Sequence, residues 1–263
     1  MSHYGRAVLI AGFPIIRDYF AWMRKFAKKG DKYEFSYKYK KLRKLLTTLS
    51  RSFRVDYHVE GLENIPEETC CIISNHLSAY DPVSLITVLD KPCTFVAKKE
   101  LENKPFAGKV IKGIDGLFLD RKDLKQSLRL MMKVEDDLKN KKDKNWIIYP
   151  EGTRNKDHLM NLKEFHHGTF RPAVKAQVPI VPVATYGTFR VLKKKPNYKK
   201  YPVFIKILEP IYPEQYKDMT TQEIAALCQS RIERVVDFEL RKKDFEEMAK
   251  IKKEKGYLFN RTY

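Results

Sequence analysis

His76 and Asp81 are the side chains of this sequence best suited to acid–base chemistry. They lie five positions apart, directly after an apolar run at 69–74 that predicts a buried strand. At a strand-to-helix turn the chain can fold back, so that the Asp81 carboxylate fixes the tautomer of the imidazole. The other ring nitrogen could then take a proton from an attacking hydroxyl. A structural alternative stays open here, because Asp81 could simply cap a helix that begins at Pro82.

A basic side chain follows the next apolar run, at residues 117–119. Arg121 stands where a strand would end, and its planar guanidinium could bind a phosphate or carboxylate through two parallel hydrogen bonds. The alternative is a surface ion pair with Asp120 or Asp123, which is the commoner fate of an arginine.

A third polar cluster, residues 149–154, combines Glu151, Gly152 and Arg154 in a predicted tight turn. Gly152 would allow backbone N–H groups to approach a ligand oxygen, and Arg154 would add a second cation. The apolar run 178–183 contains two prolines and no titratable group. It is typical of an edge strand, of a pocket wall, or simply of core.

The elements that would position these clusters alternate along the chain. Strands are expected at 55–60, 69–74, 94–97, 117–119, 146–149, 180–186 and 203–208, and helices at 82–89, 124–140, 168–176 and 221–250. This order predicts an α/β fold with a mixed, mainly parallel sheet covered by helices. In such sheets ligands bind beyond the carboxyl ends of the strands, where the polar clusters fall.

Length and composition indicate one active site in a globular chain. The 263 residues suffice for one large α/β domain, here 55–263, plus an appended segment, 1–54. With 43% hydrophobic and 12% aromatic residues, the chain can build a core despite its many charges. Its four cysteines form neither a disulfide framework nor a metal-ligand pattern, which favours buried thiols in a reducing compartment.

Residues 1–54 form a basic segment with 14 Lys and Arg against 3 acidic residues. They predict two amphipathic helices separated near Gly30, with apolar side chains at helical spacing and basic side chains on other faces. This pattern is typical of helices that lie in a membrane interface. The alternative is a helical pair that packs on the protein's own core. The apolar run 7–16 is too short to span a bilayer and lacks a signal-peptide cleavage site.

In order and separation, these segments resemble the four motif blocks of the glycerolipid acyltransferases. The blocks are Asn75-His76 with Asp81, then 118–121, then 151–154, then 178–183, with further support from 95–108 and 165–170. The likeness is strongest to the bacterial 1-acyl-sn-glycerol-3-phosphate acyltransferases and covers roughly residues 55–210. Each block is weakly specific alone, but their ordered occurrence is highly specific.

The resemblance implies direct acyl transfer without a covalent enzyme intermediate. His76, oriented by Asp81, would deprotonate the acceptor hydroxyl, which would attack an acyl thioester. The substrate-binding positions that it implies are Asn75, Lys98, Arg121, Glu151, Gly152, Thr153 and Arg154. Of these, the cations would hold the acceptor phosphate, Glu151 would arrange its turn, and N–H groups near Gly152 are our candidate oxyanion donors.

We therefore expect an enzyme that makes phosphatidic acid from lysophosphatidate, with acyl-CoA or acyl carrier protein as donor and no cofactor. It would act as a peripheral protein on anionic lipid at the cytoplasmic face of the cell membrane. A metal site at His158, His166 and His167 is rejected, because their spacing matches no ordinary ligand set. Asn155, where the family often has Ser, and the His166-His167 pair leave fine acceptor specificity open.

Three alternatives remain. The first is the same chemistry with another acceptor, such as glycerol 3-phosphate or a different lysophospholipid. The second is a nucleic-acid-binding protein, suggested by the net charge of +19. It would leave His76, Asp81 and the 151–154 turn without a role, and no nucleic-acid motif is present, so no nucleic-acid partner is expected. The third is a non-catalytic membrane-binding relative, disfavoured because both His76 and Asp81 are present.

Overall fold

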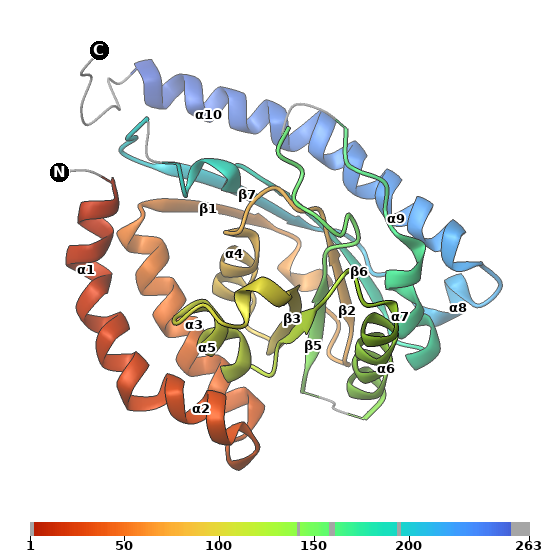
Figure 1. The fold of residues 1–263 in the computed structure, drawn as a ribbon. Helices are drawn as coiled ribbons and strands as arrows, with labels where there is room; N and C mark the ends of the chain where they lie inside the picture. Colours follow the sequence, from red (N-terminus) through yellow and green to blue (C-terminus); the bar gives the residue numbers. More distant parts are fainter. Residues whose placement is uncertain (1–2, 141–142, 158–160, 194–195, 254–263) are drawn as a thin grey trace.

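The computed structural model describes residues 3–140, 143–157, 161–193 and 196–253. Within them, the strands form one sheet in the order β1-β7-β6-β2-β5-β3-β4, with every neighbouring pair parallel except β6 and β7 (Figure 1). The strands are β1 (Val55–Glu60), β2 (Cys71–Ser74), β3 (Cys93–Lys98), β4 (Leu117–Leu119), β5 (Asn145–Ile148), β6 (Ile180–Tyr186) and β7 (Tyr201–Ile207). The predicted mixed, mainly parallel sheet is confirmed.

The helices cover both faces of this sheet. They are α1 (His3–Asp18), α2 (Arg24–Lys29), α3 (Phe35–Ser52), α4 (Asp81–Val88), α5 (Ala107–Gly113), α6 (Leu124–Asn140), α7 (Arg171–Ala176), α8 (Pro213–Tyr216), α9 (Thr221–Val235) and α10 (Arg241–Lys253). A π-helical turn, Val236–Leu240, joins α9 to α10, so the predicted C-terminal helix is continuous. The short helices α5 and α8 were not predicted, because seven and four residues are too few for a clear periodic pattern.

The central strands are buried on both faces. Cys70 and Ile72 belong to the core cluster formed with α3 and α4, whereas Cys71 and Ile73 belong to the cluster formed with α6, α7 and α9. This follows from the alternation of side chains along a strand. All four cysteines are buried free thiols, as their lack of a disulfide or metal-ligand pattern predicted.

Strand β6 is interior and buried, so the core alternative for the run 178–183 is confirmed and the edge position is excluded. It lies between β2 and β7, although it contains Pro182. The Pro182 carbonyl accepts a hydrogen bond from Leu208 N on the β7 side, and the antiparallel ladder begins one residue later, at Val183. The missing N–H therefore falls at the end of a ladder, where a central strand can tolerate it.

The N-terminal helices differ in what they cover. The apolar stripe of α3, including Leu42, Leu45 and Leu46, is buried, and α3 packs on α4. By contrast, α1 leaves five large apolar side chains exposed, namely Val8, Leu9, Ile10, Phe13 and Ile16, and the π-helical turn Tyr19–Met23 that follows it exposes Phe20. Figure 1 shows α1 and α2 as the outer layer of this side of the molecule. Among the helices described, none combines the length and the apolar character needed to cross a bilayer.

Candidate active site

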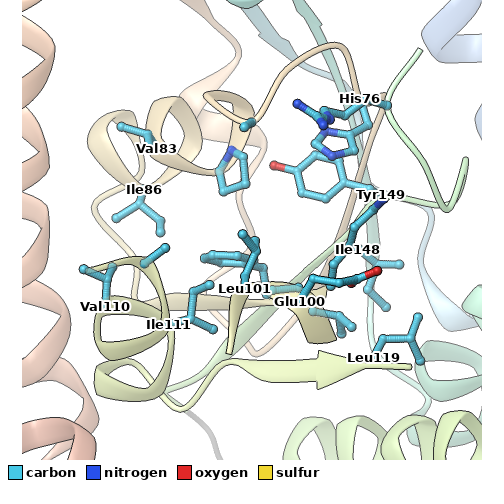
Figure 2. Close-up of a pocket in the computed structure, with 18 of the residues that line it drawn as sticks. His76, Val83, Ile86, Glu100, Leu101, Val110, Ile111, Leu119, Ile148 and Tyr149 are labelled. Atoms are coloured by element: carbon cyan, nitrogen blue, oxygen red, sulfur yellow. The ribbon is translucent and has the colours of Figure 1, made fainter. Parts of the chain in front are cut away.

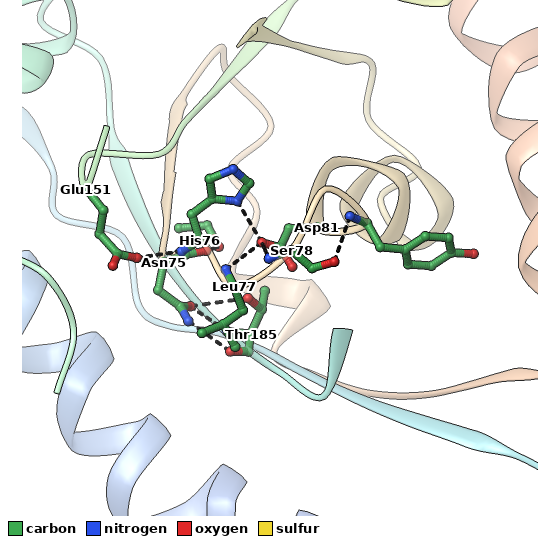
Figure 3. A network of polar contacts seen from close by, with 9 residues as sticks. Asn75, His76, Leu77, Ser78, Asp81, Glu151 and Thr185 are labelled. Carbon is green, nitrogen blue, oxygen red and sulfur yellow. Dashed lines mark hydrogen bonds and ion pairs between the residues drawn. The ribbon is translucent and has the colours of Figure 1, made fainter. Parts of the chain in front are cut away.

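His76 and Asp81 meet at the carboxyl end of β2. His76 Nδ1 lies 2.7 Å from Asp81 Oδ2, and the same oxygen accepts hydrogen bonds from Leu77 N (2.7 Å) and Ser78 N (2.8 Å) (Figure 3). Asp81 is fully buried and the His76 side chain is 18% exposed. A carboxylate that receives two N–H bonds is an acceptor for the third contact, so Nδ1 carries the proton and Nε2 is left as the basic nitrogen.

The start of α4 explains this arrangement. Asp81 is the first residue of the helix and Pro82 follows, with φ preset for a first turn. The Asp81 side chain makes no capping bond to its own helix; it turns back to the loop 76–78 instead. The geometry therefore matches the acid–base arrangement predicted from the sequence and not the simple cap.

The turn 149–155 clamps the backbone of His76 from both sides. Glu151 Oε1 accepts the His76 N–H at 2.6 Å, and Asn155 N donates to His76 O at 2.6 Å. The other Glu151 oxygen accepts the Lys163 N–H at 3.1 Å. Burial raises the pKa of Glu151, while these two N–H bonds favour the charged carboxylate. Glu151 thus fixes the loop that carries His76.

Asn75 anchors the same loop to β6. Its Oδ1 accepts the Thr185 N–H (2.8 Å) and its Nδ2 donates to Thr185 O (2.9 Å). Asn75 and Glu151, predicted as substrate-binding residues, lie behind the loop, and neither side chain lines the pocket beside His76. In this arrangement they hold His76 in place.

A cavity of about 490 Å³ opens in front of His76 (Figure 2). Its wall is mostly apolar, with side chains from α3, α4, β3, β4, β5 and α5. Five of the predicted site residues line this cavity, namely His76, Lys98, Arg121, Gly152 and Arg154, and Glu100 lines it as well. A mostly apolar space that is also lined by a base and cations fits a fatty acyl chain attached to a reactive polar group.

Adjacent strands present two of these cations. Lys98 ends β3, and Arg121 follows β4, which pairs in parallel with β3 at Lys98 and Leu119. Asp120 pairs with Lys99 at 2.8 Å. In the part of the chain that the structure describes, Arg121 has no ion pair, which favours the anion-binding interpretation over the surface pair.

Gly152 occupies a position that requires glycine. Its φ is +62°, and an added Cβ would lie 3.0 Å from the His166 ring. The Gly152 N–H already donates to Tyr149 O at 3.0 Å. Within the described residues, the N–H groups of Thr153 and Arg154 have no such acceptor, so these two are the candidate oxyanion donors of the turn. Thr153 itself lies outside the cavity lining.

Sequence reasoning missed Tyr149. Its ring stacks on the His76 imidazole, with centroids 4.3 Å apart and planes 27° apart, and it forms part of the cavity wall (Figure 2). The hydroxyl is buried and has no hydrogen-bond partner among the described residues. Burial raises its pKa well above the usual value, so the hydroxyl stays protonated. An aromatic residue at the end of a strand is too common to have singled it out.

The described residues contain no group of three or more His, Cys, Asp or Glu side chains suited to hold a metal ion. His166 and His167 are described, and His158 lies outside the described residues.

The match of a family model decides between the chemistries that this site would allow. The model described as "Acyltransferase" matches residues 56–186, which contain His76, Asp81 and the 149–155 turn. The chain belongs to the acyltransferase family.

This acyltransferase is similar to several proteins named 1-acyl-sn-glycerol-3-phosphate acyltransferase. It is 29% identical to 1-acyl-sn-glycerol-3-phosphate acyltransferase of Saccharomyces cerevisiae over 70% of this chain and 59% of that one. It is 30% identical to the human alpha enzyme of that name over 71% of this chain and 65% of that one. The chain thus spans less than two thirds of these two relatives.

A solved structure extends the likeness to nearly the whole chain. The 1-acyl-sn-glycerophosphate (LPA) acyltransferase PlsC of Thermotoga maritima superposes with a TM-score of 0.71 and 26% identity. The match covers 91% of this chain and 98% of that one. The N-terminal helices therefore belong largely to the shared architecture.

Proposed function

We propose that this acyltransferase transfers a fatty acyl group from acyl-CoA or acyl carrier protein to the sn-2 hydroxyl of 1-acyl-sn-glycerol 3-phosphate, forming phosphatidic acid. The observation that carries the proposal is the bond of 2.7 Å between His76 Nδ1 and the buried Asp81, beside a mostly apolar cavity that is also lined by three cations. The names of the relatives support the choice of acceptor.

In the proposed reaction, His76 Nε2 takes the proton of the acceptor hydroxyl as its oxygen attacks the thioester carbonyl carbon. A new C–O bond forms, and negative charge collects on the carbonyl oxygen, near the free N–H groups of the 149–155 turn. The C–S bond then breaks, and the leaving thiolate takes the proton back from His76. Asp81 stabilises the imidazolium in between, and no group on the protein is acylated.

Lys98, Arg121 and Arg154 would hold the acceptor phosphate where they line the cavity. Their role is to fix which hydroxyl reaches His76, because positioning converts a bimolecular encounter into an oriented one. The apolar wall would take the acyl chain. Glu151 and Asn75 act by positioning the loop of His76, through the backbone bonds already described.

We further propose that residues 1–54 attach the enzyme peripherally to an anionic membrane surface, at the cytoplasmic face. The exposed apolar side chains of α1 support this role, as does the excess of Lys and Arg in this segment. Helix α3 has a different role. Its residues Leu46 and Leu49 line the cavity, so α3 connects the N-terminal segment 1–54 to the proposed active site.

Acyl transfer by the purified protein tests the proposal. A labelled palmitoyl thioester, on CoA or on acyl carrier protein, is offered with lysophosphatidate, glycerol 3-phosphate or lysophosphatidylcholine in the presence of vesicles. Labelled phosphatidate as the main product would support the proposed acceptor. Preferred acylation of another acceptor would support the acyl-transfer reaction but show that lysophosphatidate is not the main acceptor. No transfer to any of the three acceptors would refute the proposal.

Arg121→Ala tests the phosphate-binding role within the same assay. The variant should raise the KM for lysophosphatidate about tenfold, since a charge-assisted hydrogen bond is lost, with a smaller effect on the KM for the donor. Monoacylglycerol lacks the phosphate and should show no such difference between variant and wild type. Arg129→Ala on α6 removes an equally exposed arginine outside the cavity and serves as the control.

A further inference from the structure

A second cavity adjoins the first one beside the loop of His76. It has a volume of about 260 Å³ and is lined by Leu77, Ser78, Ala79, Arg154, Lys156, Phe189, Leu192 and Lys193. Ala79 and Arg154 line both cavities, so the two meet directly next to the proposed general base. A ligand whose reactive group lies at His76 could therefore extend into either cavity.

Cations dominate the polar side chains of this second cavity. Arg154, Lys156 and Lys193 are all exposed at its wall, and none of them forms an ion pair with a carboxylate within the described parts of the chain. The Lys193 ammonium lies 5.6 Å from the Phe189 ring centroid, which holds it beside the cavity. Three like charges around one space repel one another. An anionic ligand bound between them would be attracted to each cation, and this attraction would offset their mutual repulsion.

Ser78 adds a neutral donor. It is 7% exposed, and its Oγ accepts the Tyr80 N–H at 3.1 Å, while the proton of the hydroxyl has no acceptor among the described residues. The N–H groups of Leu77 and Ser78 are already bound to Asp81, so these two groups are not available to an anion here. Side chains would thus hold the ligand. A hydroxyl group and cationic groups both donate hydrogen bonds, and phosphate oxygens accept strong bonds from such donors.

The identity of this anion follows from the two substrates of the proposed reaction. Both carry phosphate: the acceptor as a monoester, and the donor in the phosphopantetheine arm that CoA and acyl carrier protein share. With the acyl chain in the apolar cavity and the acceptor phosphate at Lys98 and Arg121, the thioester lies at His76. A carrier arm that passes Ala79 and Arg154, the two residues that line both cavities, would enter the second cavity.

We propose that the second cavity, through Lys156, Lys193 and Ser78, binds the phosphate groups of the carrier of the acyl donor. This inference rests on the proposed function, since it takes an acyl thioester as donor. It assigns separate cation groups to the two substrates, with Arg154 at their junction. The second cavity then sets the affinity for the acyl donor, whereas Lys98 and Arg121 set the affinity for the acceptor.

The test uses the full-length variant Lys156→Gln/Lys193→Gln, which removes two charges at exposed positions. Its KM for palmitoyl-CoA should rise about tenfold, the loss expected for two partly exposed charge contacts, with the KM for lysophosphatidate unchanged. Palmitoyl-N-acetylcysteamine lacks phosphate, so its kcat/KM should be the same for variant and wild type. Lys175→Gln/Lys217→Gln, which removes two exposed lysines that line neither cavity, should behave as wild type.

The alternative outcomes are distinct. A rise in the KM for lysophosphatidate alone would overturn the proposal, because the cavity would then hold the acceptor phosphate. Equal effects with palmitoyl-CoA and with the phosphate-free thioester would overturn it too. Titration calorimetry of CoA alone, without turnover, separates this question from the reaction: tighter binding of CoA by wild type than by the variant supports the cavity even if no acyl transfer occurs, and equal binding refutes it.

Discussion

The backbone N–H of His76 donates to Glu151 Oε1 at 2.6 Å, which links two segments that lie 75 positions apart in the chain. The bond ties the loop after β2 to the turn after β5, and these strands are neighbours in the sheet. Each side of the site therefore depends on the other for its geometry. The effects of substitutions at His76, Asp81 and Glu151 should be strongly non-additive.

The His76–Asp81 pair should be essential to turnover. His76→Ala removes the base and should lower kcat roughly 1000-fold, and Asp81→Asn should lower it by a smaller factor, because an amide can favour the wrong tautomer. Single-turnover measurements with lysophosphatidate and acyl-CoA would show both losses. Asp120→Asn, at a half-buried carboxylate that pairs with Lys99 and does not line the cavity, is the control. Retention of activity by His76→Ala would exclude it as the base.

Glu151→Gln should reduce both stability and activity. An amide keeps one acceptor oxygen, so either His76 N–H or Lys163 N–H would face an NH₂ group, and a lost buried hydrogen bond costs about 1–3 kcal/mol. Denaturant unfolding and kcat should both be affected, with the KM for the acceptor largely retained. A selective rise in that KM would mean instead that Glu151 contacts the acceptor.

The Glu151 effect should depend on pH. Burial raises the pKa of this carboxyl above its ordinary value of 4.5, so the folded chain binds its proton more tightly than the unfolded chain does. The stabilisation that comes from this tighter proton binding is fully present below pH 4.5 and is lost as the pH rises through the raised pKa of Glu151. The difference in unfolding free energy between wild type and Glu151→Gln should shrink over that range, and a growing difference would contradict the assigned direction.

Tyr149→Phe should stabilise the protein. The substitution keeps the ring stacked on His76 and removes a buried hydroxyl without a partner among the described residues, whose burial costs about 1–3 kcal/mol. Thermal unfolding should show a higher Tm, whereas Tyr149→Leu, which also loses the stacked ring, should lower it. A lower Tm for Tyr149→Phe would mean that the hydroxyl binds a water or another group.

Much of the site could be predicted because its residues follow strands. The order of strands and helices placed Arg121 and the 149–154 turn at the carboxyl ends of strands, and the resemblance to the glycerolipid acyltransferases added Lys98. Residues of all three line the cavity beside His76. The inward position of Asn75 and the stacking of Tyr149 could not be predicted, since they depend on contacts with Thr185 and His76 across the sheet. Local sequence does not encode such pairings.

The N-terminal segment shows the same limit. An apolar stripe at helical spacing buries equally well against a protein core or a bilayer, so the pattern could not separate the two. In the structure, the stripe of α3 packs inward at Leu42 and Leu46, and among the described residues 3–54 most exposed apolar side chains lie on α1 and the π-helical turn that follows it. The membrane proposal therefore reduces to α1 and the basic residues around it.

Phe13→Ala/Phe20→Ala tests that proposal. Both side chains are exposed on the N-terminal helical segment, at 74% and 62%, and loss of two inserted aromatic side chains should weaken binding to anionic vesicles about 100-fold. Phe238→Ala/Phe245→Ala, at 77% and 75% exposure near the C-terminus, is the matched control. Sedimentation with vesicles, at low and high salt, would measure both. Equal loss in the two variants would place the membrane contact on both helical segments, and unchanged binding by the first would refute the assignment to α1.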